Sequence, residues 1–227
     1  MDKYNVYQDM SRRTGGEIYL GIVGPVRTGK STFIKRFMEL VVIPEISDDN
    51  EKVRTIDELP QSADGKTIMT TEPKFIPKEA AVIHFSNQET GKIRLIDCVG
   101  YLVPEAVGAI EEEKERMVKT PWSEEEIPFS KAAEIGTSKV IREHSNVGLI
   151  ITTDGSFGDI AAANFEEALQ KTVMECEKAG KPFLILVNTS RPDSQEAIQF
   201  TKRLEAQYGK TVMAVNCKTM DREDVFR

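Results

Sequence analysis

Apolar and polar residues alternate along the chain in blocks of two kinds. Short apolar runs rich in β-branched residues predict strands at residues 18–23, 93–96, 147–152, 183–187 and 211–215. Longer segments whose apolar residues have helical spacing predict helices at residues 30–42, 130–144, 164–179 and 195–208. Because strands alternate with helices of this length, the pattern predicts an α/β fold with a mostly parallel sheet and helices on both faces.

One pair of predicted strands breaks this alternation. Residues 80–85 and 92–96 are joined by the turn-like sequence SNQETG, which favours an antiparallel hairpin. A mostly parallel sheet with one antiparallel hairpin strand after the first helix is the arrangement of GTPase-type domains. The segments 44–72 and 101–129 show no sustained period. We expect no regular element in either segment. Each is either a solvated surface loop or a connection with a functional role.

Composition narrows the class of protein. A chain of 227 residues can bury one large core, so we expect residues 1–227 to form a single domain. The formal net charge of −7, without a basic run, argues against a nucleic-acid partner. Three dispersed cysteines and two histidines indicate neither a zinc site nor a disulfide framework, which fits a cytoplasmic location. No apolar run approaches the roughly 18 residues of a membrane span, and no secretory signal is expected.

The strongest motif is GPVRTGKS at residues 24–31, which matches G-x-x-x-x-G-K-[ST] between a predicted strand and a predicted helix. Glycines let successive N–H groups cradle phosphate oxygens, and the helix N-terminus adds positive partial charge. We expect Lys30 to reach the β- and γ-phosphates and the Ser31 hydroxyl to bind Mg²⁺. The nucleotide-binding residues expected from this stretch are Gly24, Val26, Arg27, Thr28, Gly29, Lys30, Ser31 and Thr32.

Two further segments complete the expected metal and phosphate site. Asp97 ends the apolar run IRLID and begins a D-x-x-G sequence that ends at Gly100. A carboxylate at this strand tip can hold Mg²⁺. The Gly100 N–H can donate to a γ-phosphate. Thr70 and Thr71 precede the first hairpin strand, where one of them would reach Mg²⁺ and the γ-phosphate; a threonine-rich strand entry is the other interpretation. The expected metal ligands are therefore Ser31, Asp97 and Thr70, with Thr71 as the alternative to Thr70.

Two residues near the γ-phosphate depart from the common GTPase pattern. Many GTPases orient the attacking water with a glutamine after the D-x-x-G glycine, whereas this chain has Tyr101. Water must then be oriented by another group, such as Thr70 or Thr71, or hydrolysis is slow until a partner helps. Arg27 is a candidate source of positive charge for the transferring phosphoryl group, and an exposed arginine in solvent is the alternative.

The sequence after the fourth predicted strand bears on which base is bound. Guanine specificity in this architecture normally comes from N-K-x-D, whose aspartate accepts hydrogen bonds from guanine. This chain has Asn188, which we expect to bind the nucleotide, but then Thr-Ser-Arg191, so an arginine replaces the acceptor. Without that acceptor, the motif no longer accounts for a preference for guanine. ATP is therefore the expected nucleotide. Asp193 lies two positions later and leaves GTP as the alternative.

Several blocks of the sequence resemble the N-terminal part of the stage IV sporulation protein A family, and the likeness covers nearly all 227 residues. These blocks are RTGGEIYLGIVGPVRTGKSTFIKRFMELVVIP, DELPQSADGKTIMTTEPKF, IRLIDCVGY, TPWSEEEIPF, AAEIGTSKVI and ITTDGSFGDI. The resemblance implies a P-loop NTPase of the translation-factor GTPase type that hydrolyses ATP. It implies that Lys30 is the Walker lysine, Asp97 the metal-linked acid, and Thr70 and Thr71 sensor threonines.

The same resemblance implies a purpose for the nucleotide. Members of that family use ATP to polymerise irreversibly into the basement layer of the spore coat, on the mother-cell side of the forespore surface. They continue into middle and C-terminal regions associated with assembly, with a small amphipathic membrane protein and with other coat proteins. Two other hypotheses stay open on the residues alone, namely a GTPase-type switch and a structural assembly protein that binds nucleotide statically.

Overall fold

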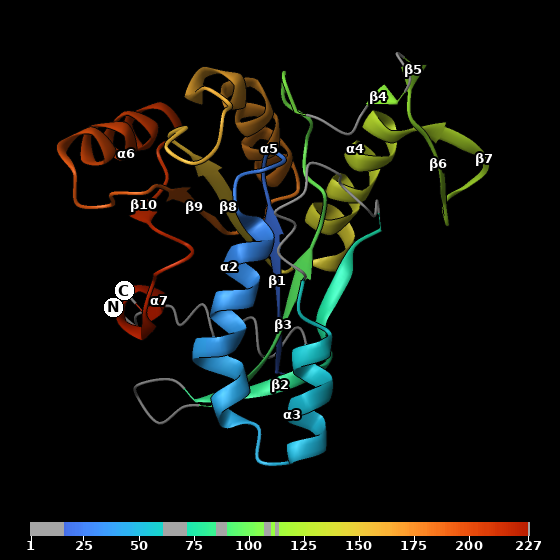
Figure 1. Cartoon of the computed structure of the whole chain (residues 1–227), viewed down its shortest axis with the longest axis vertical. Helices are drawn as coiled ribbons and strands as arrows, with labels where there is room; N and C mark the ends of the chain where they lie inside the picture. The colour runs from blue at the N-terminus through green and yellow to red at the C-terminus, as the bar shows by residue number, and fades with distance from the viewer. Residues whose placement is uncertain (1–15, 61–71, 85–89, 107–109, 112–113, 227) are drawn as a thin grey trace.

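The computed structural model describes residues 16–60, 72–84, 90–106, 110–111 and 114–226. Its main element is a six-stranded sheet of order β10-β9-β8-β1-β3-β2. All neighbours are parallel except β2 and β3. The strands are β1 (Glu17–Val23), β2 (Lys74–His84), β3 (Thr90–Asp97), β8 (Val147–Thr153), β9 (Phe183–Asn188) and β10 (Val212–Val215). The predicted mostly parallel sheet with one antiparallel hairpin strand is confirmed (Figure 1).

The register of the parallel strands brings their carboxyl ends to one edge of the sheet. Ile22 of β1 pairs with Asp97 of β3, and Val23 pairs with Ile150 of β8. Thr153 at the end of β8 pairs with Asn188 at the end of β9. Ligands of open α/β sheets bind outside this edge, so the loops that follow β1, β3, β8 and β9 form the candidate site.

Helices cover both faces of the sheet, as predicted. One face carries α2 (Lys30–Phe37), continued by a π-helix (Met38–Val42) and a 3₁₀ turn (Ile43–Glu45). The other carries α4 (Phe129–Lys139) with its π-helical extension (Val140–His144), α5 (Glu166–Lys178) after a 3₁₀ turn (Ala162–Phe165), and α6 (Gln195–Tyr208). A short helix, α7 (Arg222–Phe226), follows β10. Among the described residues, none of the helices combines the length and the apolar character that a membrane crossing requires.

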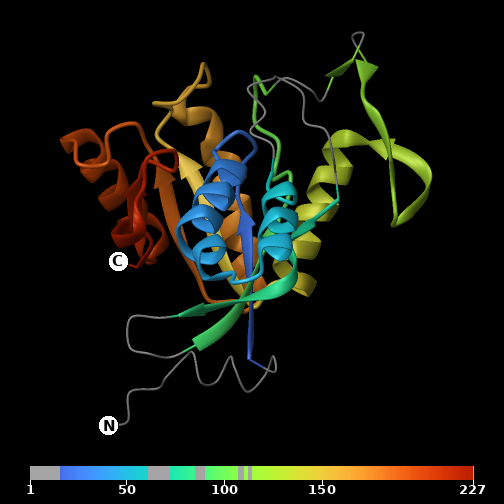
Figure 2. The same ribbon diagram turned by 60° about the horizontal axis from the view of Figure 1, so that its bottom comes forward.

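The segment 44–72, expected to lack a regular element, contains helix α3 (Asp49–Asp57). Its apolar residues do not face a core, because Val53 and Ile56 are 58% and 47% exposed. The helix begins instead at an N-cap, where the Asp48 side chain accepts a hydrogen bond from the N–H of Glu51. Capping rather than apolar spacing marks this helix, and Figure 2 shows it beside α2.

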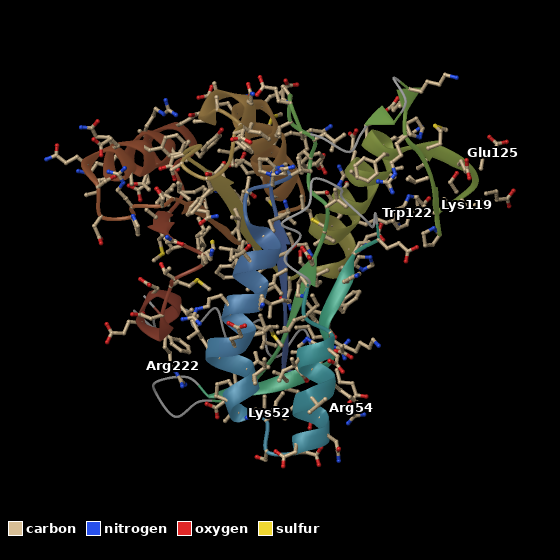
Figure 3. All side chains as sticks on the ribbon, in the orientation of Figure 1. Lys52, Arg54, Lys119, Trp122, Glu125 and Arg222 are labelled. Carbon is tan, nitrogen blue, oxygen red and sulfur yellow. The ribbon has the colours of Figure 1, made fainter. Side chains whose placement is uncertain are left out.

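The segment 101–129 was also expected to lack regular elements, and it contains two small antiparallel pairs. These are β4 (Ile110–Glu111) with β5 (Lys114–Glu115), and β6 (Met117–Thr120) with β7 (Ser123–Pro128). The β6–β7 hairpin projects from the body of the molecule, and it carries Lys119, Trp122 and Glu125 (Figures 2 and 3). It packs against α4, whose first residue, Phe129, donates its N–H to Arg116 O at 2.7 Å. Because polar residues lie on both faces of this hairpin, its sequence lacks the alternation of apolar and polar residues that predicts a strand.

Candidate functional site

The loop between β1 and α2 has a backbone that its glycines make possible. Gly24 has φ 129°, and a Cβ there would lie 2.3 Å from Ile151 O. Gly29 has φ 91°, and a Cβ there would lie 2.4 Å from the Asn188 side-chain nitrogen. Both positions therefore require glycine on two grounds, backbone conformation and space. Helix α2 begins directly after Gly29, which puts its N-terminus at the loop as the motif predicts.

Lys30 lies inside this loop rather than in solvent. The residue is 5% exposed, and its ammonium donates to Pro25 O at 2.5 Å. Burial lowers the pKa of Lys30, while Cys98 and Asp97 act in the opposite direction. A Cβ on Gly100 would lie 2.7 Å from Lys30 Nζ, so the D-x-x-G segment reaches the same point. A buried ammonium at a helix N-terminus, with a backbone carbonyl as its acceptor, suits an anionic ligand.

Ser31 and Asp97 meet beside Lys30. The Ser31 hydroxyl donates to Asp97 Oδ2 at 3.1 Å. Asp97 Oδ1 is buried and has no hydrogen-bond partner among the described residues. Burial raises the pKa of the Asp97 carboxyl, against the lowering effects of Lys30 and of the Ser31 hydrogen bond. A carboxylate oxygen without a partner next to a hydroxyl is an oxygen donor set that fits Mg²⁺.

The segment after Asp97 is fixed to the phosphate loop through its backbone. Val26 N–H donates to Tyr101 O at 2.9 Å, and Tyr101 N–H donates to Gly24 O at 3.2 Å. Gly100 between them has φ 95°, and a Cβ there would lie 2.2 Å from Gly24 O. The close approach of the two loops at Gly100 thus depends on the missing side chain.

Tyr101 occupies the position where a water-orienting glutamine is common, but its side chain is packed in a core. It is 4% exposed and belongs to a cluster with Val26, Val103 and Phe165. The Lys171 ammonium lies 4.8 Å from the centre of its ring. Burial is the main cause that raises the pKa of Tyr101. These contacts indicate a packing role for this side chain rather than contact with water at a phosphate.

The other flank of the loop is formed by the ends of β8 and β9. The Asn188 side chain donates to Thr28 O at 3.1 Å and accepts from the Cys217 N–H at 3.0 Å. Both ends of its amide are therefore used within the protein. Next to it, the Thr189 hydroxyl donates to Asp154 Oδ2 at 2.6 Å. Arg191 is exposed at the end of this loop, as is Asp193 two residues later.

The remaining expected residues fall into three groups. Val26 and Thr28 are buried, and the Thr28 hydroxyl donates to Pro25 O, so these two side chains hold the loop together. Arg27 is exposed with φ 62°, and Thr32 is partly exposed in the first turn of α2. Thr70 and Thr71 lie outside the described residues.

Two side chains at the site were missed by reasoning from the sequence. Thr137 of α4 accepts a hydrogen bond from the Gly100 N–H, and Asp154 after β8 accepts one from Thr189. The Asp154-Gly155 pair after an apolar strand is a turn signal that points to the second of them. No local signal marks Thr137, because its partner is 37 residues away in the sequence.

The class of protein follows from three features: the glycine-rich loop between β1 and α2, the carboxylate at the tip of β3, and the order of the strands in the sheet. Together they define a P-loop NTPase of the translation-factor GTPase type. A solved structure supports the fold: Era in complex with MgGDPNP and nucleotides 1506-1542 of 16S ribosomal RNA has a TM-score of 0.52 at 12% identity. That alignment covers 92% of this chain and 54% of Era. At this identity the likeness concerns the fold alone.

The family follows from sequence. The family model described as Stage IV sporulation protein A, ATPase domain, matches residues 1–227. Stage IV sporulation protein A of Bacillus subtilis (strain 168) is 52% identical over 226 residues, which are 100% of this chain and 46% of that protein. Its counterpart in Clostridioides difficile (strain 630) is 48% identical over 221 residues, 97% of this chain and 45% of that protein. The chain belongs to the Stage IV sporulation protein A family and corresponds to its ATPase domain. It spans less than half the length of these curated relatives.

Proposed function

We propose that the site between β1, β3 and α2 binds ATP with Mg²⁺ and hydrolyses it. The observation that carries the proposal is the Ser31–Asp97 pair beside buried Lys30, in which Asp97 Oδ1 has no partner from residues that the structure describes. The phosphate loop alone accounts for binding of an anion. The additional oxygen donors account for a metal ion, which phosphoryl transfer in this class requires.

Each residue of the site has a proposed role. Ser31 and Asp97 would hold Mg²⁺, together with Thr70 or Thr71, and the ion neutralises charge on the phosphates when bound. Lys30 would exchange its hydrogen bond with Pro25 O for one with a phosphate oxygen. Arg27, exposed at the mouth of the loop, would add positive charge to the transferring phosphoryl group. Gly24, Gly29 and Gly100 would hold the loop in its phosphate-binding conformation, because a side chain at any of them would collide with Ile151, Asn188 or Gly24.

The base is proposed to be adenine. The loop that follows β9 offers Asn188, whose amide oxygen accepts from the Cys217 N–H, and Thr189, whose hydroxyl donates to Asp154 and accepts from the Arg191 N–H at 3.4 Å. Both oxygens already have donors within the protein, so neither replaces the missing aspartate as an acceptor for guanine. Arg191 stands where that acceptor would be, and a positively charged group repels the guanine ring N–H donor.

The family membership supports a wider role, which we propose for the protein in its full length. Hydrolysis would drive self-assembly into the basement layer of the spore coat at the forespore surface, in the mother-cell cytoplasm. Other coat proteins and a small amphipathic membrane protein would be its partners. Within that scheme we propose that residues 1–227 act as one ATPase domain.

Phosphate release from MgATP and from MgGTP, measured side by side on the purified chain, tests the proposal. We expect turnover of ATP in preference to GTP, abolished by EDTA. A chain that hydrolysed GTP preferentially would overturn the assignment of the base. A chain that returned intact ATP in a single-turnover assay would overturn the assignment of hydrolysis.

A further inference from the structure

The Gly100 N–H, which is expected to meet a γ-phosphate, donates to a side chain of a different element. Its acceptor is Thr137 Oγ1 on α4, at 3.2 Å. Thr137 is fully buried, and its hydroxyl donates in turn to Ala133 O at 2.8 Å. The hydroxyl proton is thus used within the helix, which leaves the hydroxyl oxygen to accept from Gly100.

Gly100 also lies next to Lys30, on the side where a side chain of residue 100 would project. A Cβ built on Gly100 would lie 2.7 Å from Lys30 Nζ, and Lys30 is the side chain that marks the phosphate position. A backbone N–H is one donor, and its hydrogen bond weakens steeply when it is poorly aligned. Donation to a buried hydroxyl on α4 therefore competes with donation to a phosphate oxygen beside Lys30.

We infer that Thr137 is a positioning residue that competes with the γ-phosphate for the Gly100 N–H, and that it thereby sets how strongly the site prefers triphosphate to diphosphate. The inference rests on the proposed function, since it requires a nucleotide in the loop. When a diphosphate is bound, the Gly100 N–H still donates to Thr137. When a triphosphate is bound, the Gly100 N–H donates to the γ-phosphate and its hydrogen bond to Thr137 is lost.

This competition predicts the sign of the effect of removing the hydroxyl. Without it, the Gly100 N–H has no acceptor at the Thr137 position, whether the site is empty or holds a diphosphate. The triphosphate complex does not use that bond and is unaffected. Loss of the hydroxyl therefore strengthens triphosphate binding and leaves diphosphate binding unchanged.

The chain offers a matched control for the substitution. Thr172 on α5 is also fully buried, and its hydroxyl also donates to the carbonyl four residues earlier, Ala168 O, at 2.7 Å. Thr137→Val and Thr172→Val therefore remove the same kind of hydrogen bond from the same kind of position. Only the first removes the acceptor of Gly100. Thr137→Ser keeps that acceptor and serves as the conservative variant.

Isothermal titration of a non-hydrolysable ATP analogue and of ADP, both with Mg²⁺, tests the inference on the whole chain and these three variants. We expect Thr137→Val to bind the analogue about fivefold more tightly or better, with ADP affinity unchanged. Thr137→Ser and Thr172→Val should match the wild type in both affinities. Unchanged affinity of Thr137→Val for the analogue would overturn the inference while leaving the proposed function intact. Failure of the wild type to bind either nucleotide would overturn both.

A measurement on the wild type covers the case in which Thr137→Val does not fold. The amide proton shift of Gly100 in an NMR spectrum reports the acceptor of that N–H. It should be the same without nucleotide and with ADP, and should move when the ATP analogue binds. An equal movement with ADP would contradict the competition, because a diphosphate has no γ-phosphate to offer.

Discussion

The phosphate loop is held on two flanks, and the contacts differ in kind. On the flank of β3, the backbone of Tyr101 pairs with the loop, and the Ser31 hydroxyl donates to Asp97, whose Oδ1 has no partner in the described part of the chain. On the flank of β9, the Asn188 side chain uses both ends of its amide inside the protein. The first flank keeps polar groups available for chemistry. The second uses its polar groups to hold the loop in place.

This contrast predicts that substitutions on the first flank remove activity, whereas those on the second remove stability. Lys30→Ala should have the largest effect, because it deletes the buried ammonium of the phosphate position. We expect ATP hydrolysis to fall about 10²- to 10³-fold or more. Lys35→Ala, an exposed lysine of the same helix, is the matched control for phosphate release. Equal activity of the two variants would refute the role of Lys30.

Asn188→Ala tests the second flank. It leaves the Cys217 N–H and Thr28 O without partners, so we expect a loss of about 2 to 4 kcal/mol in the free energy of unfolding, measured with urea. Asn146 is a control with the same chemistry, because its amide bridges Tyr19 N–H and Glu17 O at the opposite end of β1. Asn146→Ala should destabilise the protein similarly, and below the denaturation transition both variants should hydrolyse ATP at the rate of the wild type. A loss of hydrolysis in Asn188→Ala that Asn146→Ala does not share would contradict the separation of the two flanks.

Arg27 gives a smaller effect that separates charge from backbone conformation. Arg27→Ala and Arg27→Gly both delete the guanidinium, but only glycine relieves the positive φ, by about 1 kcal/mol. If the charge assists transfer, both variants should lose activity equally, by about tenfold or more in kcat. A loss confined to Arg27→Gly, the variant that alone changes the backbone preference, would assign the effect to loop geometry instead.

Tyr101→Phe should have the smallest effect. A residue that orients the attacking water contributes about 10²-fold or more, whereas the buried Tyr101 ring has a packing role. Phenylalanine keeps the ring and its contact with Lys171, so we expect kcat to stay near that of the wild type. A loss approaching 10²-fold would show that the hydroxyl takes part in hydrolysis.

These predictions also show what could be read from the sequence and what could not. The phosphate loop is contiguous, and the buried strands β1, β8 and β9 are continuous apolar runs, so local pattern was enough. Helix α3 was missed because its exposed Val53 and Ile56 give no apolar stripe, although Asp48 and Glu51 at its start carry a capping signal.

At the site, the limit was distance along the chain. The contacts of Thr137 with Gly100 and of Asn188 with Thr28 join residues 37 and 160 positions apart. Their existence depends on the sheet order, which brings the loops after β1, β3 and β9 together. The approach of Ser31 and Asp97 was therefore predictable from two motifs, whereas the hydrogen bonds of Thr137 and Asn188, which no motif marks, were not.

The central claim, that Ser31, Asp97 and Lys30 form a metal and phosphate centre, is tested most directly by titrating Mg²⁺ into the ATPase reaction of the wild type and of Asp97→Asn. Asparagine keeps an acceptor for the Ser31 hydroxyl but lacks the charge, and Asp57→Asn on the exposed face of α3 is the control. The account predicts that Asp97→Asn needs about 10- to 100-fold more Mg²⁺ or is slower by that factor. An unchanged Mg²⁺ dependence and an unchanged rate would contradict it.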